Sequence, residues 1–249
     1  ENIAQKYAIS RENKNLDDTE IGGGTHDDFR QYVGAVHKEA ASDKVEGYRD
    51  HMIKVIEDRD GSTNALSSRT SEAEMVLRQA RRNDVTRVVV EPDIDGTKKD
   101  IDLYVVRAGD RPEYIEVKEW TPRLGSSRGN NMRNLLFGGR NANAKFGEAD
   151  NINGDAVVNV VVSEEHDHDE LREIIEKEIR TYREEDGGEV HIDEIRLRDT
   201  SGATQTGRIT ADDIEWGNIV GASATKGTDE PDRIAAPDRP YASAQLSTV

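Results

Sequence analysis

The chain of 249 residues contains no cysteine, few aromatic residues (5%) and no uninterrupted apolar run of about 18 residues. The first absence excludes a disulfide framework, and the last excludes a membrane-spanning helix. Positive charge is also scarce, because 34 Lys and Arg face 51 Asp and Glu and leave a net charge of −17. This balance excludes a histone-like or arm-type nucleic-acid binder, whose affinity comes from an overall positive field.

The acidity is spread along the whole chain, and 23 arginines outnumber 11 lysines. This profile is similar to that of proteins from the salt-rich cytoplasm of halophiles, where net charge keeps the surface hydrated. An ordinary acidic protein is the alternative. The chain begins at Glu1, without a signal-peptide apolar segment, so we expect a trimmed product or a fragment of something longer. The location stays open between a high-salt cytoplasm and delivery or packaging within a larger particle.

The apolar pattern divides the chain into three parts. Residues 1–68 read as a helical N-terminal extension with a linker, residues 69–200 as the main domain, and residues 201–249 as a C-terminal tail, partly extended or disordered. Helical spacing marks residues 25–36. A second helical stretch is predicted from Val45, Tyr48, Met52 and Ile56, followed by a polar linker at Gly61–Arg69.

The main domain alternates helical and strand patterns. In chain order we predict a helix at 71–82, strands at 86–91, 100–107 and 113–119, a helical region at 128–146 interrupted by Gly138 and Gly139, a strand at 155–163, a helix at 167–185 and a strand at 190–197. This order predicts an α/β (α+β) fold with a mixed β-sheet flanked by helices.

The two strands of the predicted hairpin carry charged residues at alternate positions. Asp100 and Asp102 would share one face of the first strand, opposite its apolar residues Ile101, Leu103 and Val105. Glu116 and Lys118 would share one face of the second strand. In an antiparallel hairpin, the numbers of two paired residues have a constant sum that the turn sets. A turn at residues 108–112 gives a sum near 218 to 220, which places Asp102 opposite or nearly opposite Glu116.

Two carboxylates at this distance repel each other unless a cation lies between them. Oxygen ligands of this kind suit Mg²⁺ or Mn²⁺. Lys118 would then position and help deprotonate a water molecule, or neutralise charge in a phosphoryl transition state. The alternative is a salt-bridged hairpin, in which the three residues merely form a surface cluster of ion pairs.

An acid, a hairpin turn and then Glu116-Val117-Lys118 resemble the motif of the PD-(D/E)XK nuclease superfamily, and the element order of residues 70–200 resembles its αβββαβ, restriction-endonuclease-like core. The resemblance implies that Asp102, Glu116 and the Val117 carbonyl bind the metal and that Lys118 is the water-positioning base. It also implies a glutamate from the first helix, for which Glu74 is the better candidate and Glu72 the lesser. Within the superfamily, the region after the motif looks most like toxin nuclease domains of contact-dependent inhibition systems and resolvase-like nucleases.

The dipeptide Pro92-Asp93 also matches the "PD" of the motif. However, pairing Asp93 with Glu116 would require a turn inside the strand sequence near residues 104 and 105, so we assign the ligand to Asp102 and treat Asp93 as a turn residue.

Residues 121–146 contain no Asp or Glu, although acids make up about a fifth of the chain. A basic, amide-rich segment beside a metal site is what phosphate-backbone binding requires. The basic residues of this segment, which we expect to bind nucleic acid, are Arg123, Arg128, Arg133, Arg140 and Lys145. A second basic group comprises Arg78, Arg81, Arg82 and Arg87. Pairing of these residues with the surplus acids of the chain is the alternative.

The sequence therefore predicts a Mg²⁺- or Mn²⁺-dependent endonuclease that hydrolyses phosphodiester bonds, with DNA favoured over RNA. The alternative is a non-catalytic protein of the nuclease fold that serves in a virus particle or a larger secreted polypeptide. The expected partners are nucleic acid and, for a toxin domain, an immunity protein or a larger parent assembly, but not a membrane.

Overall fold

The computed structural model describes residues 44–51, 63–94, 101–120, 128–139, 141–149, 152–162, 168–184, 187–198 and 203–220. The helices are α4 (Thr63–Arg81), α5 (Arg128–Phe137), α6 (Ala142–Glu148) and α7 (His168–Glu184). The strands are β1 (Val45–Glu46), β2 (Val85–Val90), β3 (Leu103–Arg107), β4 (Glu113–Trp120), β5 (Asp155–Val162), β6 (Glu194–Arg198), β7 (Thr204–Ile209) and β8 (Ile214–Trp216).

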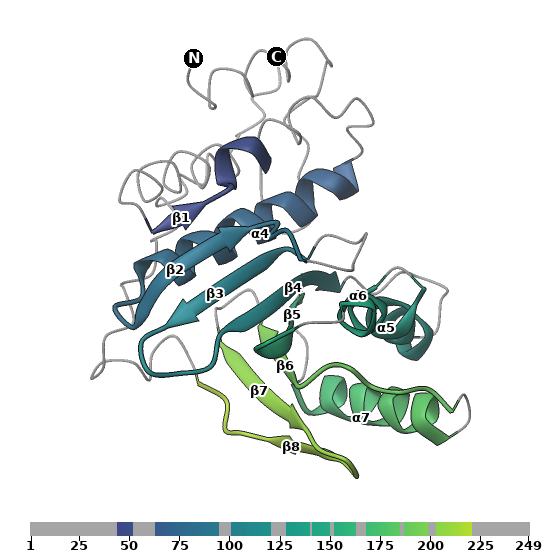
Figure 1. Cartoon of the computed structure of the whole chain (residues 1–249). Coiled ribbons are helices and arrows are strands. Elements are labelled where there is room, and N and C mark those ends of the chain that lie inside the picture. The colour runs from purple at the N-terminus through teal and green to yellow at the C-terminus, as the bar shows by residue number, and fades with distance from the viewer. Residues whose placement is uncertain are drawn as a thin grey trace, which may run out of the picture.

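The eight strands form one mixed sheet in which the spatial order follows the chain order, β1 to β8 (Figure 1). The pairs β2–β3, β3–β4, β6–β7 and β7–β8 are antiparallel. The pairs β1–β2, β4–β5 and β5–β6 are parallel. The predicted α/β class, a mixed sheet with helices on its faces, is confirmed.

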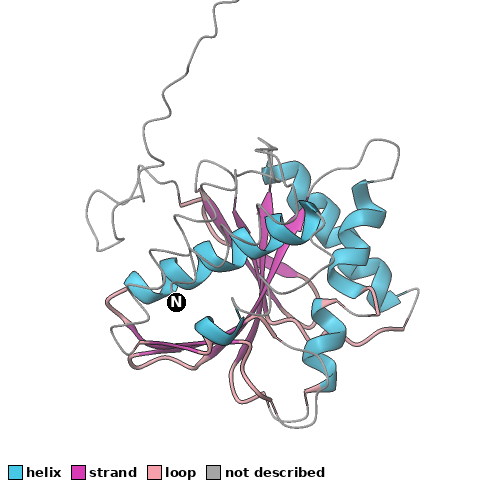
Figure 2. Cartoon of the chain, turned by 90° about the horizontal axis from the view of Figure 1, so that it is seen from above, coloured by secondary structure: helices cyan, strands magenta, loops and turns pink. Residues whose placement is uncertain are grey.

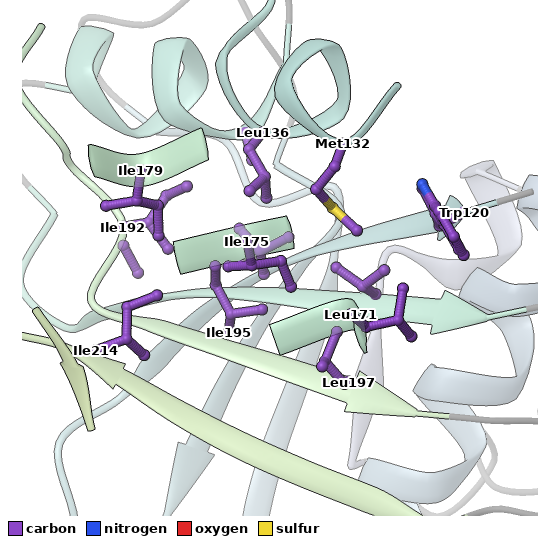
Figure 3. Close-up of a cluster of buried hydrophobic side chains, with 14 of the residues drawn as sticks. Trp120, Met132, Leu136, Leu171, Ile175, Ile179, Ile192, Ile195, Leu197 and Ile214 are labelled. Carbon is purple, nitrogen blue, oxygen red and sulfur yellow. The ribbon is translucent and has the colours of Figure 1, made fainter. Parts of the chain in front are cut away.

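Helices cover both faces of the sheet (Figure 2). On one face, α4 packs its apolar residues, among them Val76 and Leu77, against β2 to β4. On the other face, α5, α6 and α7 pack against β4 to β6. The central residues of this second cluster are Trp120, Met132, Leu136, Leu171, Ile175, Ile179, Ile192, Ile195, Leu197 and Ile214 (Figure 3).

The sequence of β5, Asp-Ala-Val-Val-Asn-Val-Val-Val, explains its central place in the sheet. A strand covered on both faces needs apolar residues at successive positions rather than alternate ones. Accordingly Val157 belongs to the cluster under α4, whereas Val158 and Val160 belong to the cluster under α5–α7. The parallel pairing of β5 with β4 also holds Glu116 opposite Val158 on the α5–α7 face.

The structure departs from the predicted elements at several places. Helix α4 begins at Thr63, inside the predicted linker 61–69, because its apolar side packs on the sheet and outweighs the weak helix propensity of its Ser- and Thr-rich start. Val45 lies in β1, which pairs with β2, and not in a helix. The last predicted strand, 190–197, corresponds to β6, which begins only at Glu194.

Within the predicted tail 201–249, β7 and β8 extend the sheet through Trp216. β7 pairs with β6 and β8 with β7, and Ile209, Ile214 and Trp216 pack on the cluster under α5–α7. The predicted helix at 25–36, the predicted helical residues Met52 and Ile56, and residues 221–249 lie outside the described residues. Within the described ranges, none of the helices combines the length and apolarity needed to cross a membrane.

Candidate active site

The hairpin between β3 and β4 has the predicted register. Leu103 pairs with Ile115 and Tyr104 with Tyr114, so the paired numbers sum to 218, within the predicted range. The chain reverses at residues 108–112, where Gly109 has a φ of 85°, a conformation that glycine adopts without steric cost. This register brings Asp102 to the level of Glu116.

Asp102 lies just before β3 begins and does not follow the alternation expected for it. Leu103 and Val105 face α4, but Ile101 belongs to the opposite apolar cluster, so the regular strand does not extend back to residue 101. The Asp102 side chain instead accepts a 2.7 Å hydrogen bond at Oδ2 from the backbone N–H of Val117. The carboxylate thus takes the place of a strand carbonyl beside β4.

Glu116 lies at the centre of the site and its side chain is fully buried. Two ammonium groups contact the same carboxylate oxygen, Oε1: that of Lys118, two residues along β4, and that of Lys145 on α6, at 2.6 Å. The Lys145 ammonium also lies 4.0 Å from Asp102 Oδ1. The second oxygen of Glu116, Oε2, is buried and has no hydrogen-bond partner among the described residues.

The electrostatics of the site reflect two carboxylates crowded in a poorly hydrated place. Burial, and next the charge of Glu116, raise the pKa of Asp102 well above its ordinary value, and the two lysines oppose this only in part. Burial lowers the pKa of Lys118, but the carboxylates of Glu116 and Asp102 outweigh burial and hold the pKa above its ordinary value. Lys118 is therefore a charged ammonium in this arrangement, which suits it to hold anionic groups.

Of the two α4 glutamates, the structure brings Glu72 and not Glu74 toward the pair. The charge of Glu72 is among those that raise the pKa of Asp102 and of Lys118. Glu74 instead binds Arg78 at 3.1 Å and Arg198 of β6. The difference arises from helix geometry, since residues two apart on a helix point to different sides.

A buried histidine that the sequence did not single out holds Glu72. His51 lies in the short helical turn after β1, 3.3 Å from Glu72 and 2.7 Å from Glu91. Glu91 follows β2, and its backbone N–H donates to the carbonyl of Asp102. The turn after β1, helix α4 and the end of β2 thus meet at His51, and no local pattern in the sequence indicates this contact.

Of the residues predicted to bind nucleic acid, the structure describes the side chains of Arg133 and Lys145, and both lie against acidic side chains. Lys145 points into the carboxylate site, and Arg133 lies 3.9 Å from Glu178 of α7. Arg128 begins α5, and Arg123 and Arg140 lie outside the described residues. In the second basic group, Arg78, Arg82 and Arg87 pair with Glu74, Asp84 and Glu46, as the alternative of internal pairing predicts.

Two features of the oxygen atoms at this site bear on whether a metal ion could bind there. An anionic oxygen that is buried without a donor, Glu116 Oε2, fits a cation. The N–H and C=O of a residue in a strand point to the same neighbour, so the Val117 carbonyl faces the Asp102 side, as a third oxygen ligand would. Among the described residues, however, three or more His, Asp or Glu side chains do not gather into a ready-made metal cage.

Comparison with family models, with curated proteins and with solved structures gives no match.

Proposed function

We propose that the chain is a divalent-metal-dependent nuclease whose site is formed by Asp102, Glu116 and Lys118. The single observation that carries this proposal is the buried Glu116, with one oxygen bound by two ammonium groups and the other without a donor. A purely structural ion pair would satisfy both oxygens, because an unsatisfied buried anionic oxygen is costly.

The order of elements around the site supports the finer fold that the resemblance implies. Helix α4, the antiparallel strands β2, β3 and β4, the helices α5 and α6, and the strand β5 beside β4 follow one another as in an αβββαβ core. In the proposed core, β4 carries Glu116 and Lys118 in the middle of the sheet, where both neighbours fix its backbone.

The residues would divide the chemistry as follows. Asp102, Glu116 and the Val117 carbonyl would hold Mg²⁺ or Mn²⁺, which supplies Lewis acidity toward the phosphodiester and eases deprotonation of the attacking water. Lys118 orients that water and stabilises the negative charge that develops on the phosphoryl oxygens. The water oxygen forms a new bond to phosphorus, the ester P–O bond breaks, and the leaving oxygen takes up a proton.

The substrate class follows from charge. The acid-free segment 121–146 follows the site in the sequence, and its residues Arg123, Arg128 and Arg140 are the candidates for contacts with a phosphate backbone on an otherwise anionic protein. We propose DNA in preference to RNA as the substrate.

Cleavage assays test the proposal. Plasmid, single-stranded DNA and tRNA are incubated with the protein and either Mn²⁺ or EDTA, at low and at multimolar salt. We expect Mn²⁺-dependent cleavage that Lys118→Ala abolishes while binding is largely retained. Lys177→Ala, at an exposed position of α7, is the matched control and should cleave normally. Cleavage that persists in EDTA and in Lys118→Ala would remove the assignment.

A non-catalytic protein of the same fold, serving in a larger assembly, is the second candidate. The internal neutralisation of Glu116 by two lysines and the lack of a three-acid cage in the described part of the chain favour it. Intact substrates under every metal and salt condition, together with co-purification of an immunity-type or assembly partner, would favour this candidate.

A further inference from the structure

Lys145 places a second ammonium between the two carboxylates of the candidate site. It comes from α6, whereas Lys118 comes from β4, and it contacts Glu116 Oε1 at 2.6 Å and Asp102 Oδ1 at 4.0 Å. Its side chain is largely buried against this pair, at 15% exposure, and is thus part of the site rather than of an open basic surface.

The charges at the centre of the site already balance. Asp102 and Glu116 carry two negative charges when both are ionised, and Lys118 and Lys145 carry two positive ones. A divalent cation added to this set would meet two ammonium groups in a place of low dielectric constant, where like charges repel strongly. One ammonium must therefore move away when the cation enters.

The geometry selects Lys145 as the group that moves. Lys118 is held by a backbone that pairs with β5 in the centre of the sheet. Lys145 lies in the last turn of the seven-residue helix α6, and its four-carbon side chain reaches the carboxylates from the edge of the site. It bridges both carboxylates, which is the position a metal ion would take.

We propose that Lys145 is an internal counter-cation that occupies the metal position, and that a divalent cation binds by displacing its ammonium. This inference rests on the proposed metal site. The role inferred for Lys145 is therefore not the binding of nucleic acid that the sequence predicted. Instead, Lys145 controls access of the metal to Asp102 and Glu116. Metal binding and the ion pairs of Lys145 with the carboxylates then exclude each other, so each weakens the other.

The test measures metal affinity rather than activity. Lys145→Met keeps the aliphatic length and removes the charge, and Lys177→Met on the exposed side of α7 removes the same charge elsewhere. We expect titration calorimetry to show Mn²⁺ binding about tenfold tighter in Lys145→Met than in the wild type, and an unchanged affinity in Lys177→Met. Equal or weaker Mn²⁺ binding in Lys145→Met would overturn the inference.

Thermal unfolding separates a counter-cation from an ordinary structural ion pair. Without metal, Lys145→Met leaves two buried carboxylates with one ammonium, so its Tm should fall by roughly 5 °C, and saturating Mn²⁺ should restore it to the wild-type value. A loss of Tm that Mn²⁺ does not reverse would show that the lysine is structural only.

The wild-type protein provides a test that does not depend on the folding of a variant. Acetylation of Lys145 by an N-hydroxysuccinimide ester, followed by mass spectrometry of its peptide, should be about tenfold faster with Mn²⁺ than with EDTA, because a displaced side chain leaves its largely buried place beside Glu116 and becomes accessible to the reagent. An unchanged rate at Lys145 would contradict displacement.

Failure of this inference can be told apart from failure of the proposed function. If the wild type cleaves DNA with Mn²⁺ and Lys145→Met shows no gain in affinity, only the counter-cation role is lost. If neither protein binds Mn²⁺ or cleaves any nucleic acid, the metal site and the counter-cation role fall together.

Discussion

The backbone N–H of Val117 donates a 2.7 Å hydrogen bond to the Asp102 carboxylate, which joins the middle of β4 to the residue just before β3. This bond fixes the Asp102 side chain in the plane of the sheet, beside Glu116, where a further backbone pair would otherwise lie. Asp102 and Glu116 thus lie side by side because β3 begins only at Leu103, whereas the neighbouring strand β4 continues past Glu116 to Trp120.

Replacing Asp102 by Asn separates the role of the charge from that of the hydrogen bond. Asn retains an acceptor for the Val117 N–H but removes the negative charge, so we expect nucleic-acid cleavage to fall about 100-fold or more. Burial and the charge of Glu116 raise the pKa of Asp102, so the folded state favours the protonated form, and stability is lost as the pH rises above the ordinary value of 3.8. At neutral pH the variant should therefore be at least as stable as the wild type.

Urea unfolding and cleavage assays check this prediction, with Asp110→Asn in the exposed hairpin turn as the control. A destabilised Asp102→Asn that still cleaves at the wild-type rate would contradict both parts.

His51 should make the stability depend on pH in the alkaline range. Burial lowers the pKa of this histidine, but its ion pairs with Glu72 and Glu91 outweigh burial and raise the pKa from 6.5 to about 9. The folded state holds the proton more tightly, so the stabilisation is complete below pH 6.5 and is lost as the pH rises through about 9. Its size is about 3 kcal/mol.

The free energy of unfolding, measured from pH 6 to pH 10, should fall in the wild type and should change much less in His51→Gln. Parallel pH profiles for the two proteins would show that the histidine does not hold this proton.

Glu113 at the start of β4 neutralises two arginines. Its oxygens lie 2.8 to 3.2 Å from nitrogens of Arg107 and Arg196. Burial raises the pKa of Glu113, but the two arginines outweigh burial and lower the pKa to about 2, so the stabilisation is present above pH 4.5 and is lost as the pH falls through about 2. Glu113→Gln removes the carboxylate that the two guanidinium groups share and leaves Arg107 with Asp84 and Arg196 with Glu194, so it should cost about 3 kcal/mol.

Denaturant unfolding at pH 7 measures this loss, and Glu215→Gln at an exposed position of β8 is the control. A loss no larger than that of the control would show that Asp84 and Glu194 alone suffice to neutralise the two arginines.

The net charge of −17 predicts that salt stabilises the protein. Screening relieves the mutual repulsion of the surplus acids, whereas the buried pairs of the site are screened much less. We expect the Tm to rise by several degrees between 0.1 M and 2 M KCl. A Tm that falls over this range would contradict adaptation to a salt-rich cytoplasm.

The centre of the candidate site could be placed from the sequence because it is local. A turn at 108–112 sets the register that brings Asp102 to the level of Glu116, alternation along β4 relates Glu116 to Lys118, and the observed register agrees with the expected one. The same local patterns gave the helix and strand order between residues 71 and 198 and the α/β class.

Other features could not be predicted because they depend on packing between distant segments. Residues 204–216 carry no strong strand pattern. They form strands because β7 pairs with the edge of β6, β8 pairs with β7, and Ile214 is buried in the core. Choosing correctly between Glu72 and Glu74 requires knowledge of how α4 is rotated about its axis, and the contact between the helix and the sheet sets that rotation.

By itself, the amino-acid sequence determined which side chains face each other across the β3–β4 hairpin, because a strand alternates with a period of two and a short turn fixes the register. Only the tertiary structure decided that Lys145 joins the carboxylates and that His51 holds Glu72. Those contacts depend on how α6 and the turn after β1 dock against the sheet, and burial of apolar surface sets that docking without leaving a signal in the spacing of the charged residues.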